Sequence, residues 1–369
     1  MWNCQRLITR RFNKKNIAME KNLKTQGFVL LDVDVVALNN SGKNTTSNFD
    51  NAVATKTIYK NGKCYVYVSG QAWRYWWREA LQKNMGWELS PVVRDNKIAY
   101  TNANPVRYAD DDVFGYMRAA AEEIVDDRGR KKSVNVTVTR VSPLKNSAVV
   151  SVASVKPVEN WSSMARQEGD SVPYARQEYS AVMKGMFSLD IDMVGTFSDY
   201  NKTGFMNISD KLKKDALENG CVEIDDNYVQ NRKLVRMPDE TRKQRAVDTI
   251  KALKNISGGA MQTNNLGDVT PKFIVLATTN TGSHPFSHIA KSRGERDDAA
   301  VLNIEGLREV IDDYRDNFIG KIFIGKRSGF MDDDTENLKQ LAEEYKGFVE
   351  FGTVNEMIDA YCAQLEKQM

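Results

Sequence analysis

A change of hydrophobic period at Ser69 constrains the fold of this chain more than any other feature. Residues Cys64 to Val68 alternate aromatic and β-branched side chains, a pattern typical of a short strand. Apolar residues then recur at helical spacing, and Ser69 is placed to cap the first turn of the helix. The apolar residues are Trp73, Trp76, Trp77, Ala80 and Leu81. The sequence therefore predicts a strand followed at once by an amphipathic helix, whose tryptophans pack against a sheet.

Other segments add strands and helices in a mixed order. Alternating or continuous apolar runs predict strands at 28–37, 134–138, 148–155, 187–193, 272–277 and 321–325. We expect the second and third of these to form a hairpin, because the connector between them contains Pro143. Helices are predicted at 116–125, where alanine is frequent, and at 238–254, 304–318 and 354–365. This order indicates an α+β fold in which the last third is a compact α/β tail.

The charge balance does not by itself indicate a partner. The chain has 369 residues, with 52 Lys and Arg against 49 Asp and Glu, and a formal charge of +3. A nucleic-acid surface would therefore depend on segregated charge rather than on bulk basicity. The four cysteines stand singly, without the paired spacing of a zinc or redox site, which fits a reducing cytoplasm. No apolar run approaches the roughly 20 residues that span a bilayer, so we expect no membrane insertion.

Several short patterns resemble metal or catalytic sites but lack the parts that such sites need. His284 and His288 are four residues apart, yet Pro285 disfavours a regular helix between them. The acidic runs 110–112 and 332–334 are expected to be solvated loops without a role. The sequence contains no Gly-rich phosphate loop followed by Lys-Ser or Lys-Thr, and no nucleophile elbow. We therefore expect no metal, no cofactor and no enzymatic activity.

The start of the helix after Ser69 is the best candidate for a binding site. A helix N-terminus offers backbone N–H groups and the positive end of the helix dipole to a phosphate. An Asn-rich loop at 38–54 precedes this helix, and Arg74 and Arg78 lie one turn apart on its polar face. A simpler interpretation fits as well, in which Ser69 only caps a core helix and Arg74 is solvated. The residue pattern leaves both interpretations open.

Five short segments stand in a distinctive order along the chain. They are ALNN (37–40), YVSGQAWRY (67–75), RVSPLK (140–145), RQEYS (176–180) and GGAMQ (258–262). In this order they resemble the Cas-seven backbone family, and within it the DevR-type branch of subtype I-B CRISPR systems. The likeness is dispersed over roughly residues 27–290, and the tail beyond it adds nothing recognisable.

The resemblance implies a modified RRM-like, or ferredoxin-like, palm with finger and thumb insertions and an α/β extension at the C-terminus. Residues 1–24 would be a flexible basic extension, 25–300 the palm with its insertions, and 301–369 the C-terminal extension. The insertions would be a thumb at about 130–170 and fingers at about 84–130 and 198–256.

The resemblance also implies the function of the protein. It would be the backbone subunit of a type I surveillance complex, and it would catalyse nothing itself. Copies would polymerise along a guide RNA beside other subunits of the complex and leave the RNA bases free to pair with a target DNA strand. The complex would serve either interference or guided transposition.

Most contacts in such a protein run to RNA phosphates and sugars, which position the strand without reading its sequence. The matching candidates in the loop, the helix start and the later segments are Asn39, Asn40, Ser69, Gln71, Arg74, Arg176, Gln177, Met261 and Gln262. The candidates on the thumb are Arg140, Lys145, Met164 and Arg166, of which Arg140 and Lys145 would contact phosphates. The simpler interpretation of the thumb is an exposed hairpin with incidental basic residues.

Two other functions remain open at this stage. Related backbone subunits of type III complexes cleave target RNA through a metal ion and an Asp in the loop after the first strand, and Asp50 lies in the comparable loop. The second is a generic single-strand-binding protein of RRM-like fold that acts outside CRISPR defence.

Overall fold

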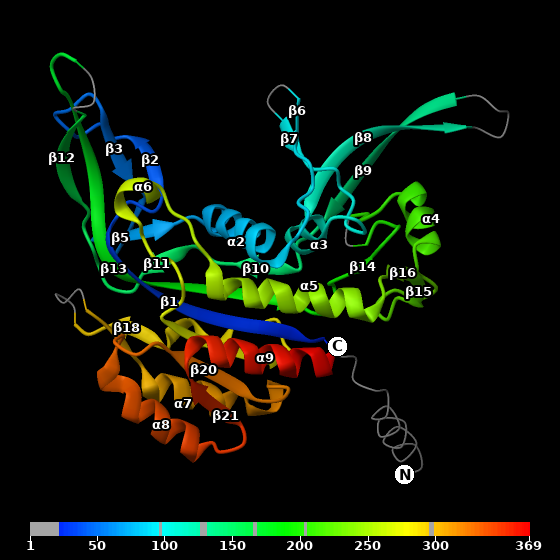
Figure 1. Cartoon of the computed structure of the whole chain (residues 1–369). Helices are drawn as coiled ribbons and strands as arrows, with labels where there is room; N and C mark the ends of the chain where they lie inside the picture. The colour runs from blue at the N-terminus through cyan, green and yellow to red at the C-terminus, as the bar shows by residue number, and fades with distance from the viewer. Residues whose placement is uncertain (1–21, 96–97, 126–130, 165–167, 203–204, 295–298) are drawn as a thin grey trace, which may run out of the picture.

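One sheet of twelve strands organises the computed structural model of the chain (Figure 1). The structure describes residues 22–95, 98–125, 131–164, 168–202, 205–294 and 299–369. The main path of the sheet runs β21 (Val349–Gly352), β20 (Ile322–Lys326), β17 (Phe273–Thr279), β1 (Lys24–Val36), β13 (Val172–Asp190), β11 (Val149–Ser151), β5 (Lys63–Val68) and β4 (Thr57–Lys60). The strands off this path are β2 (Asn40–Lys43), β3 (Ala52–Thr55), β10 (Leu144–Asn146) and β12 (Val158–Met164).

Strand β1 lies inside the sheet and pairs antiparallel with both β13 and β17. Its residues 25–31 are all buried, because helices cover both faces of the sheet. Val29 belongs to the hydrophobic core on one face and Phe28 to the core on the other. The strands predicted at 28–37, 187–193 and 272–277 are confirmed, with the second of them forming the end of the long strand β13.

The first face of the sheet carries α2 (Gly70–Met85), α5 (Asp239–Lys251) and α9 (Val354–Gln368). Trp77 of α2 lies edge-on to Phe187 of β13 with a ring separation of 5.0 Å, and its Nε1 donates to the Thr249 carbonyl oxygen at 2.7 Å. Trp73 packs beside them, 5.5 Å from the Trp77 ring. The prediction that these tryptophans are core residues is confirmed, and so is the cap at Ser69.

The second face is covered by α7 (Ile304–Asp313), α8 (Thr335–Glu344) and the short helix η2 (Pro285–His288). The short helix η3 (Arg315–Asn317) follows α7, and η4 (Asp332–Asp334) precedes α8. The helices and strand predicted in this last third are present. They do not form a separate tail, however, because β20 and β21 extend the main sheet beyond β17. Helix α9 then returns to the opposite face and packs against α5.

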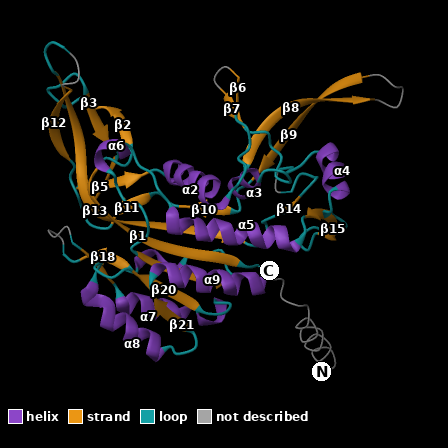
Figure 2. Ribbon diagram, viewed as in Figure 1, coloured by secondary structure: helices purple, strands orange, loops and turns teal. Residues whose placement is uncertain are grey.

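Two long hairpins project from the body on the side of α2 (Figures 1 and 2). One consists of β12 and the first half of β13, and the other of β8 (Tyr116–Val125) and β9 (Lys131–Arg140). The helix predicted at 116–125 is therefore wrong: pairing with β9 overrides the helix propensity of its alanines. The predicted hairpin of 134–138 with 148–155 is wrong as well, because β9 pairs with β8 and β11 pairs with β5 and β13.

A small three-stranded sheet lies at the base of the β8–β9 hairpin. It consists of β14 (Thr196–Phe197), β16 (Lys233–Arg236) and β15 (Val222–Asp225), and α4 (Asp210–Glu218) packs on it around Phe197 and Val235. The remaining elements are the hairpins β6 (Val93–Asp95) with β7 (Ile98–Tyr100) and β18 (Ala290–Ser292) with β19 (Ala300–Leu302), and the helices α3 (Ala109–Phe114), η1 (Ala252–Asn255) and α6 (Gln262–Asn265).

The insertions predicted from the resemblance do not coincide with single elements of the fold. Residues 130–170 contain β9 of one projecting hairpin and β12 of the other, with β10 and β11 of the main sheet between them. Residues 198–256 contain most of the small sheet, and also α5, which packs on the main sheet. Of the predicted N-terminal extension, residues 1–21 lie outside the described residues. Within the described ranges, no helix is both long and apolar enough to cross a membrane.

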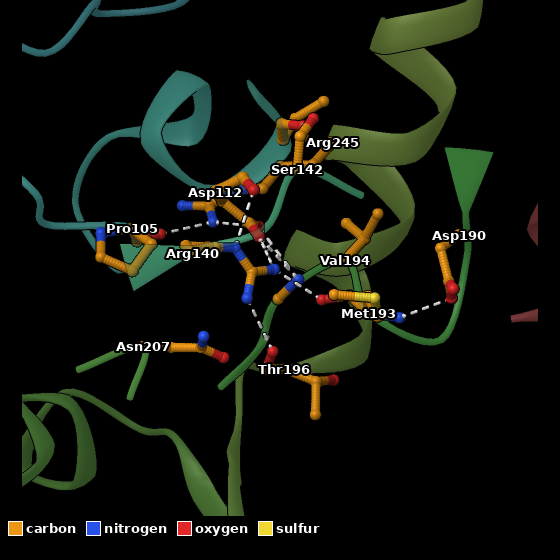
Figure 3. A network of polar contacts seen from close by, with 12 residues as sticks. Pro105, Asp112, Arg140, Ser142, Asp190, Met193, Val194, Thr196, Asn207 and Arg245 are labelled. Atoms are coloured by element: carbon orange, nitrogen blue, oxygen red, sulfur yellow. Dashed lines mark hydrogen bonds and ion pairs between the residues drawn. The ribbon is translucent and has the colours of Figure 1, made fainter. Parts of the chain in front are cut away.

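The acidic run Asp110 to Asp112 is buried in α3, and the expectation of a solvated loop without a role is wrong. Arginines from three other elements form ion pairs with it, the first being Arg78 of α2, which contacts Asp110 at 2.6 Å. Asp112 forms ion pairs with Arg140 at the end of β9 and, at 2.7 Å, with Arg245 of α5 (Figure 3). Its carboxylate also accepts the backbone N–H of Gly195 at 2.9 Å. This network joins α3, β9, α5 and the loop after β13.

Candidate nucleic-acid interface

The predicted loop and helix start meet at the end of β1. The side-chain Oδ1 of Asn39 accepts the backbone N–H of Ser69 at 2.9 Å, and Asn40 begins β2 with its side chain exposed. Ser69 Oγ in turn accepts the N–H of Ala72 at 3.3 Å, which leaves other N–H groups of the first turn of α2 without an intrahelical partner. Gln71 lies exposed in the same turn. The loop and the helix N-terminus therefore form one polar surface.

The side chain of Arg74, on the same helix, forms most of its hydrogen bonds within the protein. Its guanidinium group donates to four acceptors from distant segments: the carbonyl oxygens of Leu144 (2.6 Å) and Phe114 (2.7 Å), Ser142 Oγ (2.9 Å) and Asn146 Oδ1 (3.1 Å). Burial, together with the nearby charge of Arg78, lowers the pKa of Arg74 to about 10. Within the described residues no carboxylate pairs with Arg74. Arg74 thus contributes positive charge here, while most of its N–H groups are already used.

A second group of predicted residues gathers around α6 and the base of the β12–β13 hairpin. Arg176 stacks on the Tyr174 ring at 5.0 Å and contacts the sulfur of Met261. Both arginine and methionine line a cavity of about 310 Å³ together with residues from β1, β12 and α6. The Nε of Arg176 is buried without a hydrogen-bond partner among the described residues. The cavity therefore places the Arg176 guanidinium group near the carboxylates of Asp34 and Glu178, with one N–H donor of Arg176 unused.

The backbone around this cavity is strained at three residues other than glycine. Val35, Met261 and Leu266 have φ values of 47°, 63° and 45°. Positive φ in a β-branched residue such as Val35 is a rare conformation that costs of order 1–3 kcal/mol, and such strain concentrates at functional sites. Asn265 of α6 holds the bend by donating to the Val35 carbonyl oxygen at 3.0 Å and to Glu178 Oε1 at 3.2 Å.

The side chains of Gln177 and Gln262 form hydrogen bonds to the backbone of neighbouring segments of the site. Gln177 Oε1 accepts the backbone N–H of Thr55 in β3 at 3.1 Å, and Gln262 Nε2 donates to the carbonyl oxygens of Gly258 and Gly267, the latter at 3.2 Å. A glycine is required at position 259, next to Gly258, because φ there is +109° and a Cβ would lie 2.6 Å from the Leu38 side chain. Gln262 therefore uses its amide donor to hold the loop, whereas Gln177 uses its amide oxygen.

The four thumb candidates are dispersed. Arg140 is 2% exposed, and its guanidinium group is occupied by Asp112 and by the carbonyl oxygens of Met193 (2.7 Å) and Thr196 (3.0 Å). The expectation that Arg140 contacts a phosphate is therefore corrected to a structural role. Lys145 is exposed in β10, and Met164 is 55% exposed at the end of β12. Arg166 lies outside the described residues.

The residues considered for metal chemistry do not come together. Asp50 is fully exposed in the loop between β2 and β3, with Lys43 as its ion-pair partner at 3.6 Å. His284 is bound to the Gly27 carbonyl oxygen through Nε2 at 3.0 Å, and burial lowers the pKa of its imidazole. In the part of the chain that the structure describes, no group of three or more His, Cys, Asp or Glu residues could hold a metal ion.

Sequence reasoning missed the residues that complete the α6 cavity. Asp34, Tyr174 and Asn265 line it, yet they stand in three segments without a shared motif. The available signal was the run Thr263-Asn264-Asn265 after the double glycine at 258–259, which is typical of a turn that presents amides. Only the folded chain places this turn against β1.

Comparison with known families identifies the family of the chain. No curated protein matches the chain. The family model described as "CRISPR-associated negative auto-regulator DevR/Csa2" matches residues 29–296, which is more than half of the chain. The chain belongs to the DevR/Csa2 family. The family assignment made from the five segments is thereby confirmed, and every candidate residue from Asn39 to Gln262 lies inside the matched range.

The solved structures similar to this DevR/Csa2 chain share little sequence with it. One is a chain of a "CRISPR RNA-guided surveillance complex", with 10% identity, a TM-score of 0.48, and coverage of 92% of this chain and 99% of that chain. Another is a chain of a "CRISPR RNA-guided surveillance complex, pre-nicking", with 10% identity, a TM-score of 0.47, and coverage of 93% and 100%.

Proposed function

We propose that the protein is a guide-RNA-binding backbone subunit of a subtype I-B CRISPR surveillance complex in the cytoplasm. Copies of it would polymerise along the RNA beside the other subunits, without catalysing a reaction, and present the RNA bases to a target DNA strand. The assembly would serve interference or guided transposition. The membership of the DevR/Csa2 family, a CRISPR-associated family, supports this proposal.

The observation that carries the proposal is the convergence of distant segments on one surface. The end of β1, the first turn of α2, the base of the β12–β13 hairpin and α6 come together there. What they offer is helix N–H groups, amides and the cations Arg74 and Arg176, which suit phosphate and sugar contacts. Such contacts hold a strand without reading its sequence, as a subunit that must accept any guide requires.

We propose further that the palm is RRM-like. Four strands support this in the order β17-β1-β13-β11, each antiparallel to its neighbour. Helix α2 lies between β1 and β11 in the chain, and α5 lies between β13 and β17, as a ferredoxin-like arrangement requires. Because α7 and α8 cover the second face of this sheet, bases would not stack on exposed sheet aromatics. The two projecting hairpins would supply the thumb and one finger.

Replacing Arg176 with alanine is expected to weaken RNA binding to a similar degree for all sequences. The slope of log affinity against log salt should become shallower by about 0.7, the contribution of one phosphate contact to a single strand. Fluorescence anisotropy with several RNA sequences over a salt series measures both effects. Arg308→Ala is the matched control, because Arg308 of α7 is paired with Glu344 at 3.0 Å on the other face. An effect confined to one RNA sequence would contradict a phosphate contact.

A further inference from the structure

A cavity of about 590 Å³ lies between the loop after β13, the small sheet and the end of α9. Met193, Ile224 and Gln368 line it from these three parts of the fold. Figure 1 shows the small sheet at the end of the body opposite the β12–β13 hairpin. None of the RNA-binding candidates that the structure describes lines this cavity. A ligand can therefore occupy it without competing with the guide RNA.

The first described residues of the chain lie at the edge of this cavity. Asn22, where the description begins, is one of the lining residues. The backbone N–H of Leu23 donates to Asp192 Oδ2 at 3.0 Å, and Lys24 pairs with Asp190 at 2.6 Å. Both aspartates also line the cavity. Residues 1–21 are thus joined to the chain at the rim, and a chain of this length spans up to roughly 70 Å, so length does not keep them from the cavity.

Residues 1–21 differ in composition from the rest of the chain. The whole chain has nearly equal numbers of basic and acidic residues, whereas Glu20 is the one acid of this segment. Its cations are Arg6, Arg10, Arg11, Lys14, Lys15 and Lys21, and its larger apolar residues include Trp2, Leu7, Ile8, Phe12 and Ile17. A segment that is both cationic and apolar is complementary to a surface of carboxylates and exposed apolar side chains.

Two carboxylates of the cavity have no ion-pair partner among the described residues. Asp225 is exposed on β15, and Asp192 is half-buried and accepts the Leu23 N–H. Burial raises the pKa of Asp192, because its charged form loses hydration without gaining an ion-pair partner. A cationic side chain beside Asp192 would stabilise the ionised form.

The cations that line the cavity are already engaged. Lys202 pairs with Asp226. Arg242 is buried, and its guanidinium group donates to two backbone carbonyl oxygens and, at 3.2 Å, to Asp239. Arg236 lies 3.7 Å from the same aspartate. The charge that remains uncompensated is therefore negative, which repels RNA phosphates and attracts a basic segment.

The rim of the cavity adds exposed aromatic rings. Tyr228 is 70% exposed and Phe205 is 43% exposed. Lys202 lies over the Tyr228 ring at 5.3 Å, so this ring already accepts one cation. Arginine side chains stack on such rings, and exposed apolar groups gathered at one place are typical of a binding surface. The cavity thus offers both kinds of group to which residues 1–21 are complementary.

We propose that residues 1–21 bind in this cavity of their own chain, with basic side chains against Asp192 and Asp225 and apolar side chains against Phe205 and Tyr228. The direct connection through Asn22 gives the segment an effective concentration in the millimolar range, which favours its own cavity over that of another copy. The bound segment joins the small sheet to α9. This inference does not depend on the proposed RNA-binding function.

Zero-length cross-linking of the full chain tests the contact directly. A carbodiimide joins an amine to a carboxylate only where the two groups touch. In low salt and without RNA, we expect monomers in which Lys14 or Lys15 is joined to Asp192 or Asp225, identified by mass spectrometry of the digested protein.

The internal control is the ion pair of Lys24 with Asp190, which should cross-link in every sample. Asp225→Asn should remove the links to that position and leave this control link in place. Absence of any link from Lys14 or Lys15 to the lining carboxylates would overturn the inference. Links found only in cross-linked dimers would also overturn it, because the segment would then bind another copy.

Trypsin cleavage within residues 1–21 of the full chain measures how far the cavity protects them. We expect Asp192→Asn combined with Asp225→Asn to raise the cleavage rate about tenfold, because two ion pairs are lost. The amide oxygen at position 192 still accepts the Leu23 N–H, so the fold is kept. Asp50→Asn is the matched control, because Asp50 is fully exposed and lies outside the cavity.

The cleavage rates separate binding in the cavity from binding to RNA. Equal rates in the double variant and the unchanged chain would overturn the inference. Protection that appears only after RNA is added would overturn it as well, because the segment would then bind RNA instead of the cavity.

Discussion

Replacing Asp112 with alanine should lower the free energy of unfolding by about 3–5 kcal/mol, the usual effect of breaking a buried ion network by removing one partner. Asp112 has no exposed side-chain surface, and it holds Arg140 and Arg245 at once. Removing it leaves two guanidinium groups buried among carbonyl oxygens without a counter-charge (Figure 3). Chemical denaturation followed by circular dichroism measures the change.

The control for this prediction is another aspartate that lies on the surface. Asp50→Ala removes a fully exposed carboxylate with one ion-pair partner at 3.6 Å, and it should change stability by less than about 0.5 kcal/mol. If Asp112→Ala behaved like Asp50→Ala, the network would not be what joins α3, α5 and the base of the β8–β9 hairpin.

Replacing Trp77 with alanine should destabilise the fold by about 3–5 kcal/mol as well, for a different reason. The ring is fully buried between Trp73 and Phe187, so its loss leaves a cavity in the main core. The Thr249 carbonyl oxygen also loses the donor at 2.7 Å that joins α2 to the end of α5. The expected loss is visible as an earlier unfolding midpoint in denaturant.

Tyr75→Ala is the matched control on the same helix, because its ring is largely exposed and its removal should leave stability within about 0.5 kcal/mol. Trp77→Ala should in addition weaken RNA binding at temperatures where α2 loosens, since the first turn of α2 forms part of the proposed interface. Equal stability of the two variants would contradict the role of Trp77 as the anchor of α2.

The elements with a strong local period could be predicted from the sequence. The tryptophan spacing after Ser69 defined α2, its buried face and its cap, while an alternating pattern defined β1 and a continuous apolar run defined β17. In these segments the local conformational preference and the tertiary packing favour the same structure, so the sequence pattern is sufficient to predict the element. The alanines of 116–125 are the opposite case, because strand or helix there depends on whether a partner strand is available.

The candidate site was only partly predictable, because charge and burial at a residue depend on its neighbours in space. Asp112 and Arg140 each look solvated when considered alone, and they become a buried pair only when α3 meets the end of β9. The motif residues of the loop and α2 could be found because they are close in sequence. The cavity at α6 could not, since Asp34, Tyr174 and Asn265 come together only through the long-range pairing of β1 with β13.

Purification of the chain after expression with and without its guide RNA tests the central claim most directly. Mass measurement should find discrete RNA-filled oligomers only when the guide is present, because neighbouring copies would share the strand. A labelled RNA incubated with Mg²⁺ should stay intact. An RNA-free monomer under both conditions would contradict the backbone function. Periodic cleavage of the RNA that Asp50→Ala abolishes would instead establish a nuclease and contradict the expectation that the protein catalyses nothing.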